Sequence, residues 1–459
     1  MEQTIKTPKK KHGLTTTRII ALGFACAILA GGLILMLPVS SADGSWTKPI
    51  DALFTATTSI CVTGLVTVTT AVHWSFFGQL VIMILAQLGG LGVITAAMCI
   101  MLLLRKKITL KDRMLIQETY NMDTLSGLVR LVIKIVKGTF LVEGVGALLY
   151  CFVLIPEFGF WPGLWKSVFN AVSAFCNAGM DVIGSDSLRA YAGNPLMNIT
   201  TMMLIVLGGL GFVVWWNIID AWRERKKHGH MRHLLTLHTK LVLIMTGGLI
   251  FGGALCFFLF EYHNPDTIGN MSLGNKIMNS LFQSVTTRTA GFETIPQASM
   301  TSGSTLLMII LMIIGGSPAG TAGGIKTTTV GILLLIMLST IRGKKDTEFM
   351  GRKISDDAGR TALTVTGLAM LVMLTACIIL FATDGLGFVD TLYEVASAMG
   401  TVGLTRGITQ GLSTVGKAAL IVVMYIGRIG PVTMGLALAM RRRGQEQNRT
   451  LPEERILIG

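Results

Sequence analysis

The chain has 459 residues, of which 51% are hydrophobic and 14% are charged, and its mean hydropathy is +0.64. Because soluble domains carry about a quarter of charged residues, this composition excludes an ordinary soluble protein and indicates an integral membrane protein in a lipid bilayer. The net charge of +14 does not indicate nucleic-acid binding, because the basic residues gather between apolar runs.

The basic residues predict the orientation of the chain. Most of the 39 lysines and arginines lie in the N-terminus and in four later stretches, 105–137, 223–240, 342–360 and 441–455. The positive-inside rule makes these stretches cytoplasmic, with both termini inside. The first apolar run, 19–38, could serve as a signal peptide, but its uninterrupted length and the absence of a small-residue cleavage site favour a retained span.

Four passages of the sequence share one pattern. Each has an apolar span, a half-length amphipathic segment that begins near an aromatic residue, a glycine, and a second span with a glycine cluster. The aromatic residue and the glycine are ten residues apart in three passages and nine in the third: Phe54 and Gly64, Phe169 and Gly179, Phe282 and Gly291, Tyr393 and Gly403. Close helix packing explains each glycine cluster alone but not the shared spacing, so we predict a fourfold repeat.

Each repeat is expected to fold as a span, a re-entrant half-helix, an extended loop and a second span, because segments such as 51–60 and 390–399 are too short to cross a bilayer. The predicted fold is an all-α integral membrane protein of four tandem span–pore helix–span repeats, with eight transmembrane helices around a central ion pore. The predicted repeats are the first (18–104), the second (131–222), the third with a broken second span (240–341) and the fourth (362–440). The predicted cytoplasmic segments are the N-terminus (1–17), three loops (105–130, 223–239 and 342–361) and the tail (441–459).

The loops after the four half-helices form the candidate ion site. Half-helix carboxyl ends carry partial negative charge that favours a cation, and glycine permits the backbone angles that turn carbonyls inward. Such oxygens suit alkali ions and replace their hydration shell. The expected carbonyl ligands belong to Val62, Thr63, Gly64, Asn177, Ala178, Gly179, Thr289, Ala290, Gly291, Thr401, Val402 and Gly403. Only the last three match the start of the potassium-channel signature, so the predicted selectivity is imperfect. Asp51 and Asp390 are expected to cap two half-helices.

The second span of the third repeat is expected to break in mid-membrane, because it is too rich in glycine and proline to continue as a helix. Such a break would lie below the ion site and serve as a gate, or else be a passive packing kink. The candidate gate residues are Gly315, Gly316, Ser317, Pro318, Ala319, Gly320, Thr321, Ala322, Gly323, Gly324, Lys326 and Arg428. A phosphate-binding loop is excluded, because Ile325 separates the last glycine from Lys326.

Charged residues inside the spans are costly and tend to face partners or pores. Arg428 occupies a glycine position of the repeat, so it is expected either to face the axis and hold the gate or to pair structurally with a neighbouring helix. Arg288 is expected to brace its loop, and Glu143 has no assigned partner. Catalytic residues and an organic cofactor are not expected, because the seven cysteines lie singly and the histidines lie outside the clear spans.

Taken together, the fourfold plan, the stretch Gly315–Thr329 and the sequence Gly427–Gly430 resemble the Ktr/Trk/HKT superfamily of potassium transporters, with the closest likeness to the membrane subunit of bacterial Ktr systems. The resemblance implies a non-enzymatic potassium uptake pathway in a bacterial cytoplasmic membrane, with sodium as a second candidate ion. It also implies a homodimer controlled by a cytoplasmic ring of RCK-type nucleotide-binding regulatory subunits, and a tail, 452–459, in subunit contact. In the resembled family, glycine at all four filter positions favours potassium. The alternative from the residues alone is a secondary transporter of a small solute, but such proteins usually show two broken-helix loops and not four.

Overall fold

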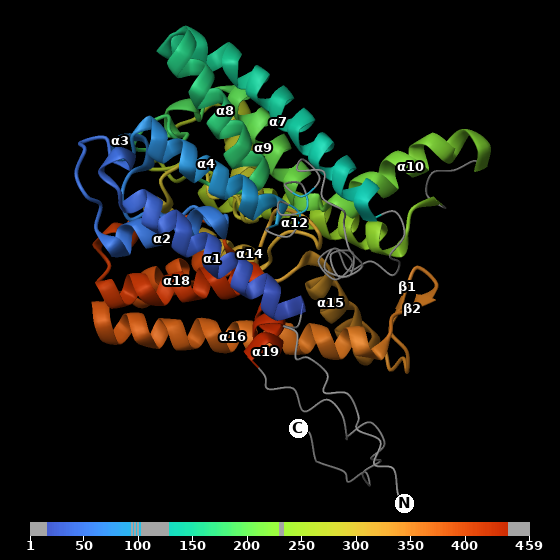
Figure 1. Cartoon of the computed structure of the whole chain (residues 1–459). Coiled ribbons are helices and arrows are strands. Elements are labelled where there is room, and N and C mark those ends of the chain that lie inside the picture. Colours follow the sequence, from blue (N-terminus) through green and yellow to red (C-terminus); the bar gives the residue numbers. More distant parts are fainter. Residues whose placement is uncertain are drawn as a thin grey trace, which may run out of the picture.

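The computed structural model describes residues 16–92, 95, 98, 101, 128–228 and 234–438 (Figure 1). Within these ranges the chain is mostly helical, as predicted. One antiparallel hairpin is added to the prediction: strands β1 (Glu348–Phe349) and β2 (Arg352–Lys353) pair within the third basic loop. The tail expected in subunit contact, 452–459, lies outside the described residues.

Four long helices begin the four repeats. They are α1 (Thr16–Met36), α7 (Leu128–Phe158), α12 (Leu237–Glu261) and α16 (Asp356–Asp384). Among the described residues, these four have the length and apolarity to cross a membrane, and one bent helix pair is a fifth candidate. Their positions agree with the predicted first spans.

A shorter helix follows each long one and ends just before a candidate ion-binding loop. These helices are α2 (Pro49–Ile60), α8 (Phe160–Cys176), α13 (Leu273–Thr286) and α17 (Phe388–Gly400). Each packs against the long helix that precedes it in the chain. The predicted half-helices are therefore present in all four repeats.

A third helix in each repeat begins with the same kind of cap. The helices are α4 (Phe76–Leu91), α9 (Pro195–Leu210), α14 (Ser302–Ile313) and α18 (Thr414–Ile429). The side chains of Ser75, Asn194, Thr301 and Ser413 each accept a hydrogen bond from the backbone N–H three residues later. Such a bond satisfies a donor that the helix leaves free, and its recurrence in four units is further evidence of duplication.

The remaining short elements lie in the connections. They are α3 (Thr70–His73) and the 3-10 helices η1 (Pro38–Ser40), η2 (Arg189–Tyr191), η3 (Gln297–Ser299) and η4 (Thr409–Gly411). The element η1 lies between a long helix and the short helix of its repeat. Each of the other four lies between an ion-site loop and the third helix of its repeat.

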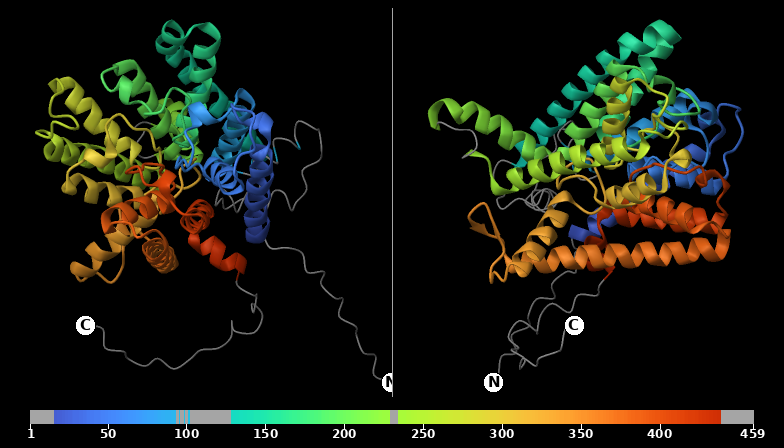
Figure 2. Two further views of the ribbon diagram at one scale, coloured as in Figure 1. Left: turned by 90° about the vertical axis from the view of Figure 1, so that its left-hand side faces the viewer. Right: turned by 180° about the vertical axis from the view of Figure 1, so that it is seen from behind.

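The four repeats close into a ring. The third helix of each repeat packs against the short helix of the next: α4 on α8, α9 on α13, α14 on α17, and α18 back on α2. Figure 2 shows the blue, green, yellow and red parts of the chain arranged around a common centre. Residues far apart in the sequence therefore meet at one axis.

The breaks in the second spans are more numerous than the sequence suggested. The third is interrupted between α14 and α15 (Thr327–Ile341), as predicted. The second also breaks, because α9 and α10 (Phe212–His228) meet at an angle of 94° across Gly211. The fourth divides at Gly430 into α18 and α19 (Pro431–Leu438). The sequence analysis did not predict the other two breaks, at which Gly211 and Gly430 have φ angles of 91° and 95° that end a helix.

Candidate ion-conduction site

The four glycines predicted at the axis lie in mutual contact. A Cβ atom placed on Gly64 would lie 2.7 Å from the carbonyl oxygen of Ala178, and one on Gly179 would lie 2.6 Å from that of Ala290. The same close approach continues from Gly291 to the carbonyl of Val402 and from Gly403 to the carbonyl of Thr63. Each glycine thus faces a carbonyl of the next loop, around a closed cycle of four. No larger residue fits this arrangement without moving a carbonyl.

The backbone of the four loops follows one conformational pattern. Each glycine has a positive φ, and so does the residue two positions before it: Val62, Asn177, Thr289 and Thr401 have φ values of 50°, 60°, 69° and 52°. Non-glycine residues rarely adopt this region, and they persist there only where the surroundings hold them. The alternating backbone is therefore a constrained feature that all four repeats share.

Hydroxyl groups of the short helices hold three of these loops. Thr58 Oγ1 accepts from the backbone N–H of Gly64 at 2.9 Å, and Ser397 Oγ accepts from that of Gly403 at 3.0 Å. In the second repeat Ser173 Oγ accepts from the N–H of Met180 at 3.1 Å. The third repeat differs, because Thr286 Oγ1 donates to the carbonyl of Phe292 at 2.7 Å. These bonds tie the loops to helix ends and leave other carbonyls free.

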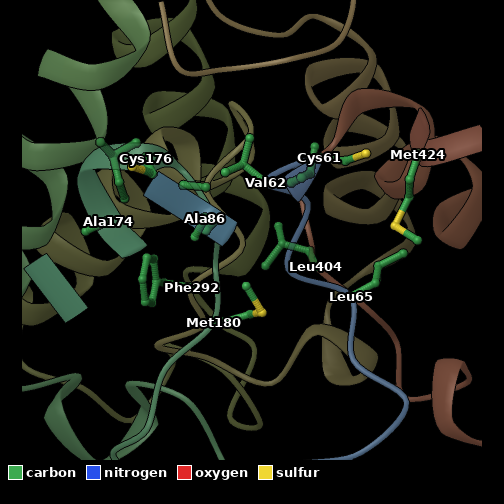
Figure 3. Packing of buried hydrophobic residues seen from close by; sticks show 14 of the residues in the cluster. Cys61, Val62, Leu65, Ala86, Ala174, Cys176, Met180, Phe292, Leu404 and Met424 are labelled. Carbon is green, nitrogen blue, oxygen red and sulfur yellow. The ribbon is translucent and has the colours of Figure 1, made fainter. Parts of the chain in front are cut away.

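A buried apolar residue follows each of the four glycines, which the sequence reasoning did not notice. These residues, Leu65, Met180, Phe292 and Leu404, are at most 2% exposed. Figure 3 shows all four around the loops, together with Val62 and Cys61. They pack behind the loops and limit how far the backbone can shift. Their shared position directly after the glycine was a signal that the spacing comparison would have revealed.

A cavity of about 320 Å³ lies on one side of the four glycines, all of which line it. Asp181, Asp186 and Glu293 contribute carboxyl groups to its wall, which Arg189 and Arg406 also line, and Arg189 forms an ion pair with Glu293 at 2.7 Å. Burial raises the pKa of Asp181 and of Glu293 above the ordinary values. The cavity therefore gives cations a polar, partly acidic approach to the glycine cycle.

The two aspartates expected to cap half-helices form ion pairs instead. Asp51 Oδ1 lies 2.9 Å from Lys417 Nζ, and this pair joins α2 to α18 across the junction of the first and fourth repeats. Asp390 Oδ1 lies 2.6 Å from Arg406 Nε. The capping prediction was wrong, because both carboxylates lie in the first turn but their partners come from elsewhere in the chain. Both carboxylates still interact favourably with the positive N-terminal end of the helix dipole.

The candidate gate loop, residues 315–324, lies directly against the ion site. A Cβ on Gly323 would collide with the side chain of Thr401, one of the ion-site residues, and Gly324 lies beside Gly400. The loop is fastened to the second repeat by hydrogen bonds from the N–H groups of Ser317 and Thr321 to carbonyls at the end of α9, at 2.9 and 3.1 Å. This loop therefore separates the glycine cycle from the space on its other side.

That space is a second cavity, of about 220 Å³, and both Lys326 and Arg428 line it. The guanidinium of Arg428 donates to the carbonyl of Thr321 in the loop and to that of Gly89 at the end of α4. Lys326 Nζ donates to the carbonyl of Ala322 at 2.6 Å. Both cations thus hold the loop in place, and Arg428 also links it to another repeat. Arg428 thus contacts both the loop and a neighbouring helix, and its position at the axis and its part in gating stay predictions.

Two other buried charges lie near the ion-site loops. Arg288 is 7% exposed, its Nε has no hydrogen-bond partner within the described residues, and its bracing of the loop stays a prediction. Glu143, to which the sequence assigned no partner, is 4% exposed and has Gln87 and Cys176 of two other helices as neighbours.

Comparison with known proteins extends these observations. The family model for TrkH, described as a cation transport protein, matches residues 22–447. The potassium/sodium uptake protein NtpJ of Enterococcus hirae is 40% identical over 99% of this chain and 100% of its own length. The Ktr system potassium uptake protein B of Bacillus subtilis is 39% identical over 97% of both chains. The crystal structure of the potassium transporter TrkH from Vibrio parahaemolyticus shares the fold, with a TM-score of 0.74 at 17% identity, and the match covers 94% of this chain and 87% of that one.

The apolar long helices, the ring of repeats and the axial glycine cycle together define a membrane protein of the cation-transport class and not an enzyme. The chain belongs to the TrkH family of cation transport proteins. The resemblance stated from the sequence is therefore confirmed at the level of the family, including its Ktr members.

Proposed function

We propose that this chain conducts potassium into a bacterial cell, passively and through one pore formed by its four repeats. The ligands for the ion are the backbone carbonyls of the four loops that end in Gly64, Gly179, Gly291 and Gly403. Relatives named for potassium uptake, and in one case for potassium and sodium uptake, support this substrate class. Sodium is accordingly a second candidate ion.

The single observation that carries this proposal is the cycle in which each axial glycine faces a carbonyl of the next loop. Four loops at one level supply oxygen atoms from all sides, which is what a dehydrated alkali ion requires in place of its water. The carboxyl ends of four short helices point toward the same place and favour positive charge there. The partly acidic cavity beyond the glycines concentrates cations at its entrance.

The loop 315–324 is the proposed gate. It lies between the glycine cycle and the cavity lined by Lys326 and Arg428, so an ion that leaves the cycle must displace it. Hydrogen bonds from Arg428 to Thr321, from Lys326 to Ala322 and from the loop to α9 keep it closed. Opening requires these bonds to exchange for others, which is the kind of change that a cytoplasmic partner can bias.

The wider arrangement follows from the charge pattern. We propose eight membrane crossings, repeat boundaries as predicted from the sequence, and both termini in the cytoplasm. The bend at Gly211 is buried against Pro318 and Ala319, as irregular structure at membrane depth requires. A homodimer and a ring of RCK-type regulatory subunits are the proposed assembly, and the name "Ktr system" of one relative supports a multi-component complex.

No chemical energy source is needed for this function. A membrane potential of 100 mV contributes about 2.3 kcal/mol for each charge moved, which concentrates potassium strongly inside the cell.

The experiment that tests the proposal is rubidium uptake into liposomes that contain the purified protein, with potassium, sodium or small organic solutes as competitors. We expect potassium to compete most strongly, sodium less, and organic solutes not at all. Competition by an organic solute in preference to potassium would favour the alternative, a secondary transporter. The four equivalent loops weigh against that alternative, because its broken helices usually number two.

A further inference from the structure

The side chain of Gln297 ends the third ion-site loop, residues 287–296, and is bonded from two repeats. Gln297 begins η3, six residues after Gly291, and is 1% exposed. Gln283 Nε2, from the short helix α13, donates to Gln297 Oε1 at 2.7 Å, and the hydroxyl of Tyr393 in α17 donates to the same oxygen at 3.3 Å. Gln297 Nε2 donates to the carbonyl of Ile295 at 2.7 Å. This one amide therefore joins the short helices of the third and fourth repeats to the end of one loop.

The fourth repeat has a hydrogen bond at the equivalent positions. In both repeats one partner directly follows the aromatic residue of the short helix, and the other lies six residues after the axial glycine. The pairs are Gln283 with Gln297 and Glu394 with Thr409. Thr409 begins η4 as Gln297 begins η3, and both Gln283 and Glu394 are fully buried. The recurrence of this bond at matched positions of a duplicated unit indicates a shared task for it.

Near its glycine the third loop is held less directly than the first and the fourth. In those two loops a hydroxyl group of the short helix accepts from the backbone N–H of Gly64 or Gly403, at 2.9 and 3.0 Å. The N–H of Gly291 reaches the carbonyl of Thr286 at 3.4 Å, which is longer than an ordinary N–H···O bond. The bonds of Gln297 at the other end of the loop therefore supply a hold that the glycine end lacks.

The effect of Gln297 on an ion passes through the backbone and not through direct contact. Its neighbours Pro296 and Ala298 line the cavity beside the glycine cycle, while its own side chain is buried. The guanidinium of Arg406, from the fourth repeat, donates to the backbone carbonyl of Gln297 at 3.3 Å. The segment that carries the ion-site residues Thr289–Gly291 is therefore fixed both where α13 ends and where η3 begins.

We propose that Gln297, held by Gln283 and Tyr393, is a positioning residue that sets the preference of the ion site for potassium over sodium. This inference rests on the proposed function, because it assigns what keeps the carbonyls of Thr289 and Ala290 at the spacing that potassium needs. Carbonyl ligands at a fixed spacing discriminate by ion size. Once the loop is released, the same carbonyls close around the smaller sodium ion, and the preference falls.

The test is rubidium uptake into proteoliposomes with sodium as the competitor, for wild type and Gln297→Leu. Leucine nearly keeps the volume of the side chain but removes the bonds from Gln283 and Tyr393. The sodium concentration that halves rubidium uptake should fall at least about fivefold, because two hydrogen bonds that hold the loop are lost. The maximal rate of rubidium uptake should stay within about twofold, because every ion ligand remains. Sodium inhibition equal to that of wild type would overturn the proposal.

Tyr393→Phe is a second variant that decides the question if Gln297→Leu does not fold. It removes one hydroxyl group and one of the two bonds to Gln297 Oε1, so the same sodium concentration should fall by about threefold. Wild-type inhibition by sodium in folded Tyr393→Phe protein would count against the role of Gln297 as strongly as in the first variant.

Gln79→Leu is the matched control for the loss of a glutamine amide. Gln79 is half-buried; its Oε1 accepts from Trp165 Nε1 at 2.8 Å, and its Nε2 donates to the carbonyl of Trp74 at 3.1 Å. These bonds join α8 to the start of α4 and not to an ion-site loop. The control should keep the sodium inhibition of wild type, and an equal change in Gln79→Leu and Gln297→Leu would reject the proposal. A wild-type protein without a preference for potassium refutes the proposed function as well, whereas variants that keep the preference refute this inference alone.

Discussion

Replacement of Gly403 by serine tests the glycine cycle at its narrowest contact. Gly403 has a φ of 95°, and a Cβ there would collide with the carbonyl oxygen of Thr63 in the first repeat. A side chain in this backbone region costs about 1–3 kcal/mol, and the collision displaces one carbonyl of the ion site. If that energy is lost from potassium binding, the preference for potassium over sodium falls by about 5- to 150-fold.

The assay is rubidium and sodium flux in proteoliposomes, with Gly407→Ser as the matched control. Gly407 has nearly the same φ, 93°, but a Cβ there meets no atom within 4 Å. The control should therefore lower stability by a similar amount and leave the ion preference unchanged. The reasoning is refuted if Gly403→Ser keeps the wild-type preference, or if both variants lose it equally.

Three further predictions concern the gate, a junction between repeats and the outer cavity. Arg428→Ala removes two hydrogen bonds of a charged donor, each worth about 1.5–3 kcal/mol. Rubidium flux without a regulator should therefore rise at least tenfold. Lower or unchanged flux in folded protein would contradict the role of the loop as a gate. Asp51→Asn leaves the half-buried Lys417 unpaired and should cost about 1.5–3 kcal/mol of stability, because a hydrogen bond between charged groups is lost. Thermal unfolding in detergent measures this loss. The double variant with Lys417→Met should recover most of it, and equal melting of the single variant and wild type would contradict the pair. Because burial raises the pKa of Asp181, this carboxylate takes up a proton in milder acid than an exposed one, and uptake should fall as external pH is lowered through that raised pKa. Asp181→Asn should flatten this decline while Asp186→Asn keeps it; the same acid profile in both variants would argue against Asp181.

The sequence indicated the four short helices and the four glycines that follow them, because both depend on local constraints. A glycine that adopts a positive φ follows the aromatic residue of its short helix by ten residues in three repeats and by nine in the third, so its position can be found in the sequence. The break between α14 and α15 was likewise readable, because proline and several glycines cannot continue a helix.

The bends at Gly211 and Gly430 were missed because their glycine clusters were placed inside continuous second spans. The last glycine of each cluster is in fact the residue that ends a helix, and Pro431 after Gly430 was an available sign of this. Contacts between repeats were beyond the sequence. The pairing of Asp51 with Lys417 joins residues 366 positions apart, and the neighbours of Glu143 come from two other helices. Such pairs depend on the closure of the ring, which no local pattern encodes.

The central claim, that four loops bind one dehydrated cation, is tested most directly by anomalous diffraction from crystals grown with rubidium. The claim predicts a rubidium peak on the axis of the glycine cycle, coordinated by carbonyl oxygens from all four loops, including that of Val402. A peak held by fewer loops, or rubidium found only in the outer cavity beside Asp181 and Glu293, would contradict it.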